Sequence, residues 1–277
     1  MTARGWTGAA LVLSLVFLAL AGDRVAGYRF DAQDTAHALE PPSRAHWLGC
    51  DALGRDLLAR LCEGGRVSLV VAVGATALAL AFGLAYGALA GWAGGRLDAL
   101  LMRAVDVIYA LPDVLVTVLL IEVLSAALAG LPDLWRRLAA LALALGFAGF
   151  VGVARLVRAL VLQAREETWV ESARASGARP ARILVRHVLP NIAPPILVSA
   201  AFRVPAAILA ESTLSFIGLG IQPPFSSWGT LASDGFEAMR SYPHLIFFPC
   251  VAILCSLIGF QLLGEALRER LDPRQRA

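Results

Sequence analysis

The side chains with the clearest chemical potential in this sequence are charged residues that interrupt long apolar blocks. Arg203 and Glu211 lie in the block Ile192–Gly218, and Ser212 follows the glutamate. If this block crosses a membrane, each charge near the bilayer centre costs about 2.5–3.5 kcal/mol on insertion scales and needs a compensating role. Arg203, Glu211 and Ser212 could border a translocation path for a polar solute. The alternative is that they pair with neighbouring helices or lie near an interface.

Neither covalent catalysis nor a metal centre is indicated. The chain has four histidines, which are widely separated and lack the spacing of metal ligands: His37, His46, His187 and His244. Serines such as Ser212 and Ser215 have no recognisable base beside them. All 24 basic residues are arginine, so the lysine that a P-loop uses to reach nucleotide phosphates is missing. We therefore expect no enzyme, no metal and no cofactor, with any ATP bound by partner subunits.

The apolar blocks predict the fold class. The sequence is 58% apolar and 16% charged, and roughly 20 residues of helix span the ~30 Å hydrocarbon layer of a bilayer. Six blocks are long enough: Gly5–Gly22, Val67–Gly95, Leu100–Leu128, Leu138–Ala154, Ile192–Gly218 and Ser241–Gly264. We predict an all-α integral membrane protein with six transmembrane helices rather than a large soluble helical protein.

The blocks also divide the chain. We expect a first transmembrane helix over residues 1–22, for which a cleaved signal peptide is the alternative, and an extracytoplasmic loop over 23–66 that contains a short surface helix from Leu53 to Val67. A core of five transmembrane helices over 67–265 and a cytoplasmic tail over 266–277 follow. A disulfide between Cys50 and Cys62 is the less favoured alternative to two thiols.

Three glycines in the second block share one helix face, because Gly83, Gly87 and Gly91 are spaced by four residues. Such a face lets a neighbouring helix approach closely. The contact could belong to a transport core or to generic helix packing.

Arginine placement predicts the orientation. Basic residues concentrate in the N-terminus, the connections after the second and fourth blocks, and the tail, all on one side of a six-span protein. Cytoplasmic loops carry such an excess. Both termini are therefore predicted to be cytoplasmic, although Arg136 and Arg137 are exceptions.

The arginine-rich segment 163–191 predicts a helix–turn–helix. Residues from Glu171 to Ser176 favour helix, Gly177 suits a helix-ending position with positive φ, and Pro180 suits the first turn of a second helix. Pro190 is expected to end that second helix before the next span begins.

This segment resembles the "EAA" loop of ABC importer permeases, whose pattern is Glu-Ala-Ala, three residues, Gly, nine residues, Ile, one residue, Leu-Pro. The matching residues are Glu171, Ala173, Gly177, Leu189 and Pro190. Ser172 replaces an alanine of the pattern and His187 replaces its isoleucine. The ending Arg-His-x-Leu-Pro-Asn is similar to the dipeptide and oligopeptide branch.

Four further segments look like the same branch, in the expected order. They are residues 47–56, residues 64–69, residues 211–229 and residues 267–274. Together with the loop they extend the resemblance over most of the chain from about residue 45.

The resemblance implies a type I importer permease in a bacterial or archaeal cytoplasmic (inner) membrane. It implies pairing with a second permease, two ATPase subunits, an extracytoplasmic substrate-binding protein and no nucleic acid. Segment 163–191 would dock in a groove of the ATPase and transmit its closure to the membrane helices. The alternatives are a permease for nickel or another metal chelate, an ATP-independent secondary transporter, and a purely structural membrane subunit.

Overall fold

The structure is a computed structural model that describes residues 3–271, so the predicted tail 266–277 lies partly outside the described residues. The described chain is predominantly α-helical. Its α-helices are α1 (Ala3–Ala26), α2 (Leu57–Ala93), α3 (Gly95–Tyr109), α4 (Asp113–Ala127), α5 (Asp133–Arg165), α6 (Thr168–Ala175), α7 (Pro180–Ile183), α8 (Leu189–Phe216), α9 (Trp228–Glu237) and α10 (His244–Leu271). A 3₁₀ turn, η1 (Thr35–His37), and a π-helical turn, η2 (Leu184–Val188), complete them.

Five helices or helical runs are long and apolar enough to cross a membrane, and α3 with α4 would form a sixth span that is bent by 94°. The prediction of one continuous helix over Leu100–Leu128 is therefore wrong. The break lies at Pro112, which precedes the first residue of α4. Proline lacks an N–H and disfavours the helical conformation in the residue before it, here Leu111, so the two halves can turn away from each other.

Helix α2 begins at Leu57, ten residues before the predicted start of the second span. Asp56 is its N-cap, and the carboxylate accepts a hydrogen bond of 2.8 Å from the backbone N–H of Ala59. This cap starts the helix inside the segment predicted as a loop. The expected surface helix from Leu53 to Val67 is therefore mostly the first part of α2, and α1 extends to Ala26.

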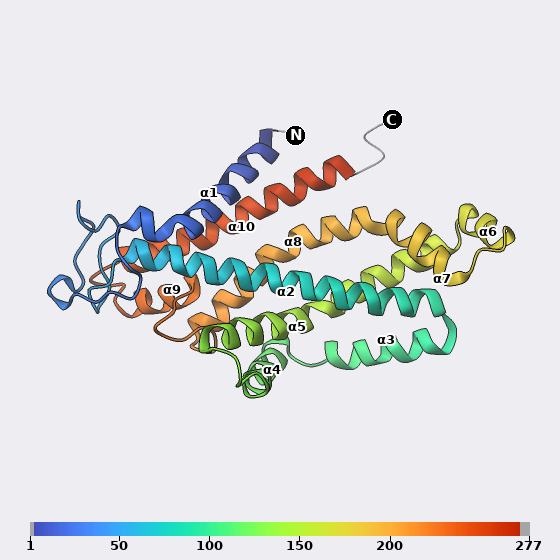
Figure 1. The fold of residues 1–277 in the computed structure, drawn as a ribbon, viewed down its shortest axis with the longest axis horizontal. Helices are drawn as coiled ribbons and strands as arrows, with labels where there is room; N and C mark the ends of the chain where they lie inside the picture. Colours follow the sequence, from blue (N-terminus) through green and yellow to red (C-terminus); the bar gives the residue numbers. More distant parts are fainter. Residues whose placement is uncertain (1–2, 272–277) are drawn as a thin grey trace.

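The helices run mainly along the long axis of the molecule (Figure 1). The loop between α1 and α2 lies with α9 at one end, and α6 and α7 lie at the opposite end. Helices α1 and α10 pack side by side, and α2 packs along α5. Helix α1 ends at the loop, and α10 begins after α9 beside the same loop. The N-terminal end of α1 and the C-terminal end of α10 therefore both point away from the loop.

The glycine stripe of α2 permits the close helix approach that the four-residue spacing predicts, and the neighbouring helix is α5. A β-carbon built at Gly83, Gly87 or Gly91 would lie between 2.5 and 3.0 Å from a β-carbon of α5. The opposing residues are spaced by four as well: Val153, Val157 and Val161. Only glycine permits this backbone approach, so the stripe fixes how α2 and α5 pack.

A buried ion-pair network fastens the loop to the helices at its end of the molecule. Asp51 accepts hydrogen bonds from Arg55 Nε at 2.7 Å and from Arg60 Nη1 at 2.6 Å, and Arg60 also reaches Asp234 of α9 at 3.2 Å. Burial raises the pKa of Asp51, but the charge of Arg60 and the backbone N–H of Arg55 outweigh it and hold that pKa below its ordinary value. The loop is thus tied to both α2 and α9.

Candidate functional site

In the turn between α6 and α7, one set of residues ends the first helix and the next residues begin the second. Gly177 has φ +80° and its N–H donates to Arg174 O at 2.9 Å, while Ala178 N–H donates to Ala173 O at 3.2 Å. These two bonds make a Schellman motif, which needs a left-handed residue at the glycine position. Pro180 then occupies the first turn of α7. The predicted helix–turn–helix is confirmed in these details.

The prediction that Pro190 ends the second helix is wrong. The chain stays helical from Pro180 to Phe216, through the π-helical turn η2 and into α8. Pro190 is the second residue of α8, two positions after the end of η2, and a proline is tolerated in the first turn of a helix because the N–H it lacks has no partner there. The side-chain amide of Asn191 also donates to the carbonyl of His187 at 2.8 Å. In the hairpin, residues 168–183, the second helix α7 therefore continues through η2 into the membrane helix α8.

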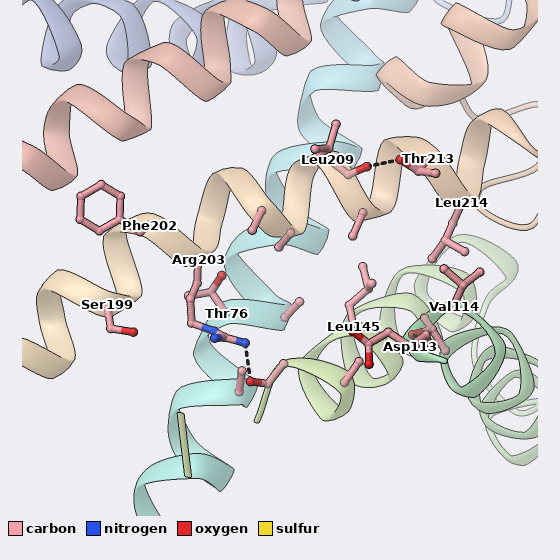
Figure 2. Close-up of a pocket in the computed structure, with 18 residues that line it drawn as sticks. Thr76, Asp113, Val114, Leu145, Ser199, Phe202, Arg203, Leu209, Thr213 and Leu214 are labelled. Atoms are coloured by element: carbon pink, nitrogen blue, oxygen red, sulfur yellow. Dashed lines mark hydrogen bonds between the residues drawn. The ribbon is translucent and has the colours of Figure 1, made fainter. Parts of the chain in front are cut away.

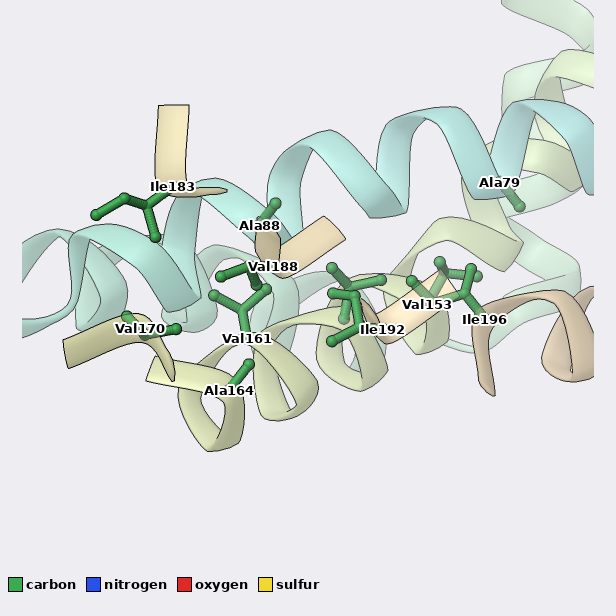
Figure 3. Packing of buried hydrophobic residues seen from close by; sticks show 11 residues of the cluster. Ala79, Ala88, Val153, Val161, Ala164, Val170, Ile183, Val188, Ile192 and Ile196 are labelled. Atoms are coloured by element: carbon green, nitrogen blue, oxygen red, sulfur yellow. The ribbon is translucent and has the colours of Figure 1, made fainter. Parts of the chain in front are cut away.

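The inner face of the hairpin is anchored in a hydrophobic cluster. Val170 of α6 and Ile183 of α7 are fully buried, and Val188 of η2 joins them. They pack with residues of α5 and α8, among them Val161 and Ile192 (Figure 3). Burying each of these aliphatic side chains contributes about 1.5–3 kcal/mol. The hairpin is thus attached to α5 and α8.

Most positions of the EAA pattern lie on the outer face of the hairpin. Glu171, Ser172, Gly177 and His187 are exposed, and Pro190 is exposed beside them. Ala173 and Leu189 are half-buried and pack against the cluster. An exposed polar face on an anchored hairpin can bind another protein and transmit a force to α8.

A cavity of about 820 Å³ lies between α2, α4, α5 and α8 (Figure 2). Its polar lining residues are Thr76, Asp113, Thr117, Ser199, Arg203 and Thr213. The guanidinium of Arg203 donates to the backbone carbonyl of Gly149 on α5. Arg203 and Asp113 also line a second cavity of about 190 Å³. One cationic and one anionic side chain therefore share an otherwise mainly apolar space.

Glu211 lies elsewhere. Its carboxylate is fully buried and accepts hydrogen bonds from Ser68 of α2 at 2.8 Å and from Ser215 at 2.7 Å, with Ser212 at 3.4 Å. Ser68 Oγ in turn accepts from the N–H of Trp228 at 3.3 Å. For Glu211 and Ser212 the structure favours the alternative interpretation, in which they join α8 to α2 and α9. The path interpretation stays a prediction for Arg203.

The comparisons with known proteins agree with these features. Residues 83–277 match the family model described as "Binding-protein-dependent transport system inner membrane component". The chain belongs to this family.

Individual relatives extend the match over nearly the whole chain. It is 36% identical over 269 residues to the oligopeptide transport system permease protein OppC of Bacillus subtilis (strain 168), which covers 97% of this chain and 85% of the relative. It is 38% identical over 270 residues to the dipeptide transport system permease protein DppC of the same organism, covering 97% and 81%. The glutathione transport system permease protein GsiD of Pectobacterium atrosepticum is 36% identical over 235 residues, covering 85% and 75%.

Membership confirms the all-α, type I importer permease fold and a multi-pass inner-membrane protein that serves as a transport component. Within that fold, the structure adds Asp113, which was not among the path candidates named from the sequence. The sequence marks it only as one acidic residue in the apolar block Leu100–Leu128. Its position directly after Pro112, where the chain turns by 94°, brings it into the cavity that Arg203 lines.

Proposed function

We propose that this chain is one of two membrane-spanning permease subunits of an ATP-driven importer. With a second, similar permease it encloses a translocation path for di- or oligopeptides. Two separate ATPase subunits bind and hydrolyse ATP on the cytoplasmic side, and an extracytoplasmic binding protein delivers the substrate at the other end. Both termini and the α6–α7 hairpin are cytoplasmic in this proposal.

The hairpin carries the proposal. It is anchored by Val170 and Ile183, presents Glu171 and Ser172 outward, and continues without interruption into α8, which lines the cavity. ATP-driven closure of the ATPases would push on this face and rock α8 along with the hairpin, a rigid-body change of the alternating-access kind.

The cavity supports a peptide as the substrate. A free peptide at neutral pH has a carboxylate at one end and an ammonium at the other. Arg203 can pair with the carboxylate through charge-assisted hydrogen bonds and Asp113 with the ammonium. The names of the relatives, which refer to oligopeptides, dipeptides and glutathione, support the same chemical class.

Cross-linking tests the coupling. After the native cysteines are replaced, Ala175→Cys on the exposed face of α6 should cross-link to the ATPase subunits of the assembled importer. Ala45→Cys, exposed in the loop at the opposite end, is the matched control and should not. Absence of the Ala175→Cys adduct, together with uphill uptake by the purified chain alone, would contradict the proposal and support a secondary transporter.

Uptake into proteoliposomes that contain the assembled importer tests the substrate. We expect ATP-dependent accumulation of a labelled dipeptide or oligopeptide and no accumulation of labelled nickel. The reverse result would assign the chain to the metal-chelate alternative while leaving the coupling intact. Unchanged transport after disruption of the hairpin would favour a purely structural subunit.

A further inference from the structure

We propose that the loop between α1 and α2 binds one divalent transition-metal ion of the Zn²⁺ type through His37, Glu40 and His46. The donor atoms of these three side chains lie within 4.8 Å of one another. The sequence predicts no metal centre because its histidines are far apart, but folding of the loop brings two of them together.

The loop backbone holds the three residues in place. The N–H of Glu40 donates to His37 O at 3.2 Å, and the N–H of Cys50 donates to Glu40 O at 2.9 Å. Ser43 and His46 exchange two hydrogen bonds, from Ser43 N–H to His46 O at 2.8 Å and from His46 N–H to Ser43 Oγ at 3.0 Å. Such local order reduces the entropy lost when an ion fixes the donors.

His46 is oriented as a ligand. Its Nδ1 lies 2.9 Å from Asp56 Oδ2, and the histidine is 7% exposed. A carboxylate at this position holds the proton on Nδ1 and leaves the lone pair of Nε2 for a metal, the arrangement in which ligating histidines are usually supported. Asp56 itself is fixed, because its other oxygen caps α2.

His37 and Glu40 complete the site from its exposed side. His37 Nδ1 lies 2.6 Å from Glu40 Oε2, and their side chains are 50% and 29% exposed. An ion would bind between these two atoms in place of their hydrogen bond. Zinc bonds of about 2.0–2.1 Å put donor atoms roughly 3.4 Å apart, so only these two less buried side chains need to move. Asp34 lies 3.9 Å from the other ring nitrogen of His37, Nε2, so a water molecule would supply the fourth donor.

The carboxylates beside the site favour a cation. They also act on the buried thiol of Cys50, whose pKa is raised to about 11 first by burial and then by these carboxylates. Those carboxylates, in decreasing order of effect, belong to Asp56, Glu40, Asp51 and Asp34. Two imidazoles in the donor set select a borderline transition metal such as Zn²⁺ over Ca²⁺ or Mg²⁺, which prefer oxygen. The bound ion would fasten the 37–46 segment to the start of α2 through Asp56.

Metal titration of the full-length chain in lipid nanodiscs, without a polyhistidine tag, tests the site. We expect one Co²⁺ per chain with the visible spectrum of four-coordinate cobalt, displaced by Zn²⁺. His37→Ala, at an exposed position, and Glu40→Gln, at a half-buried one, should each weaken Zn²⁺ binding at least tenfold. His187→Ala, at the opposite end of the molecule, is the matched control and should bind like the wild type.

Asp56→Asn adds a second readout. Asparagine can still cap α2, but its amide donates to His46 Nδ1 and moves the imidazole proton to Nε2, the proposed ligand atom. We expect Zn²⁺ affinity to fall about 10–100-fold while circular dichroism stays unchanged. Wild-type affinity in His37→Ala and Glu40→Gln, or no stoichiometric binding by the wild type, would overturn the proposal.

Discussion

The hydroxyl of Ser68 on α2 donates a 2.8 Å hydrogen bond to the fully buried carboxylate of Glu211 on α8. The two residues are 143 positions apart in the sequence. Their contact joins α2, the longest of the described α-helices, to α8, which continues from α7 of the hairpin. A buried carboxylate that keeps several donors satisfied is expensive to remove, because each donor then loses its partner inside the protein.

Glu211→Ala should therefore destabilise the protein by about 2–4 kcal/mol, since the hydroxyls of Ser68 and Ser215 lose their acceptor. Thermal unfolding in detergent, followed by circular dichroism, measures the change. Glu122→Ala, at an exposed position of α4, is the control and should stay within about 0.5 kcal/mol of the wild type. Equal stability of the two variants would show that the buried network contributes little.

Gly177→Val should uncouple ATP hydrolysis from uptake. A β-carbon at Gly177 meets nothing within 4 Å, so the strain comes from its φ of +80° and not from a collision. A left-handed conformation costs an ordinary residue about 1–2 kcal/mol but is tolerated by asparagine. We expect Gly177→Val to express and hydrolyse ATP with little uptake, and Gly177→Asn to transport. Normal uptake by Gly177→Val would count against the coupling role of this turn.

Arg203→Gln and Asp113→Asn should each raise the KM for a free dipeptide at least tenfold, because one charge-assisted hydrogen bond contributes about 1.5–3 kcal/mol and 1.4 kcal/mol is tenfold in affinity. Peptides with a blocked terminus test each residue separately. C-terminal amidation of the peptide should no longer change the KM in Arg203→Gln, and N-terminal acetylation should no longer change it in Asp113→Asn. Thr213→Val, whose hydroxyl is already bonded to Leu209 O, is the matched control. The same sensitivity to blocking in every variant would exclude these two residues from peptide recognition.

Gly87→Ala should destabilise the α2–α5 contact. A β-carbon there would collide with the backbone carbonyl of Ala154 and approach Val157 Cβ to 2.9 Å, and overpacking of this kind costs about 1–3 kcal/mol. Gly74→Ala on the same helix, where a β-carbon meets only Ala142 Cβ at 3.5 Å, should not destabilise. Thermal unfolding of the two variants distinguishes a specific close contact from a general effect of alanine.

Acid should loosen the loop through Asp51. Because its pKa in the folded protein is below the ordinary value, the charged form contributes stability above about pH 3.9, and this stability is lost as pH falls through the folded pKa. Hydrogen exchange of the loop amides, corrected for intrinsic rates, should accelerate in that range. Asp51→Asn should exchange faster at neutral pH and lose the acid dependence. Asp31→Asn, in an exposed pair with Arg29, should behave like the wild type.

Features that depend on neighbouring residues could be predicted from the sequence. Apolar blocks of membrane length predict the fold class, since a helix satisfies its own backbone hydrogen bonds within each segment. Gly177 and Pro180 predict the turn of the hairpin. Its hydrogen bonds are also local, because a Schellman motif closes within six residues. The spacing of Gly83, Gly87 and Gly91 predicts a shared face, although not that α5 would occupy it.

Which distant residues meet was decided only by the tertiary structure. Eight residues separate Arg203 from Glu211, which puts their side chains about 80° apart around the axis of α8. One therefore lines the cavity while the other is buried against α2. The bend at Pro112 brings Asp113 toward Arg203, and the folded loop brings His37 beside His46. Such pairings depend on how helices rotate and pack against one another, and residue types and spacing along a single chain do not specify that rotation.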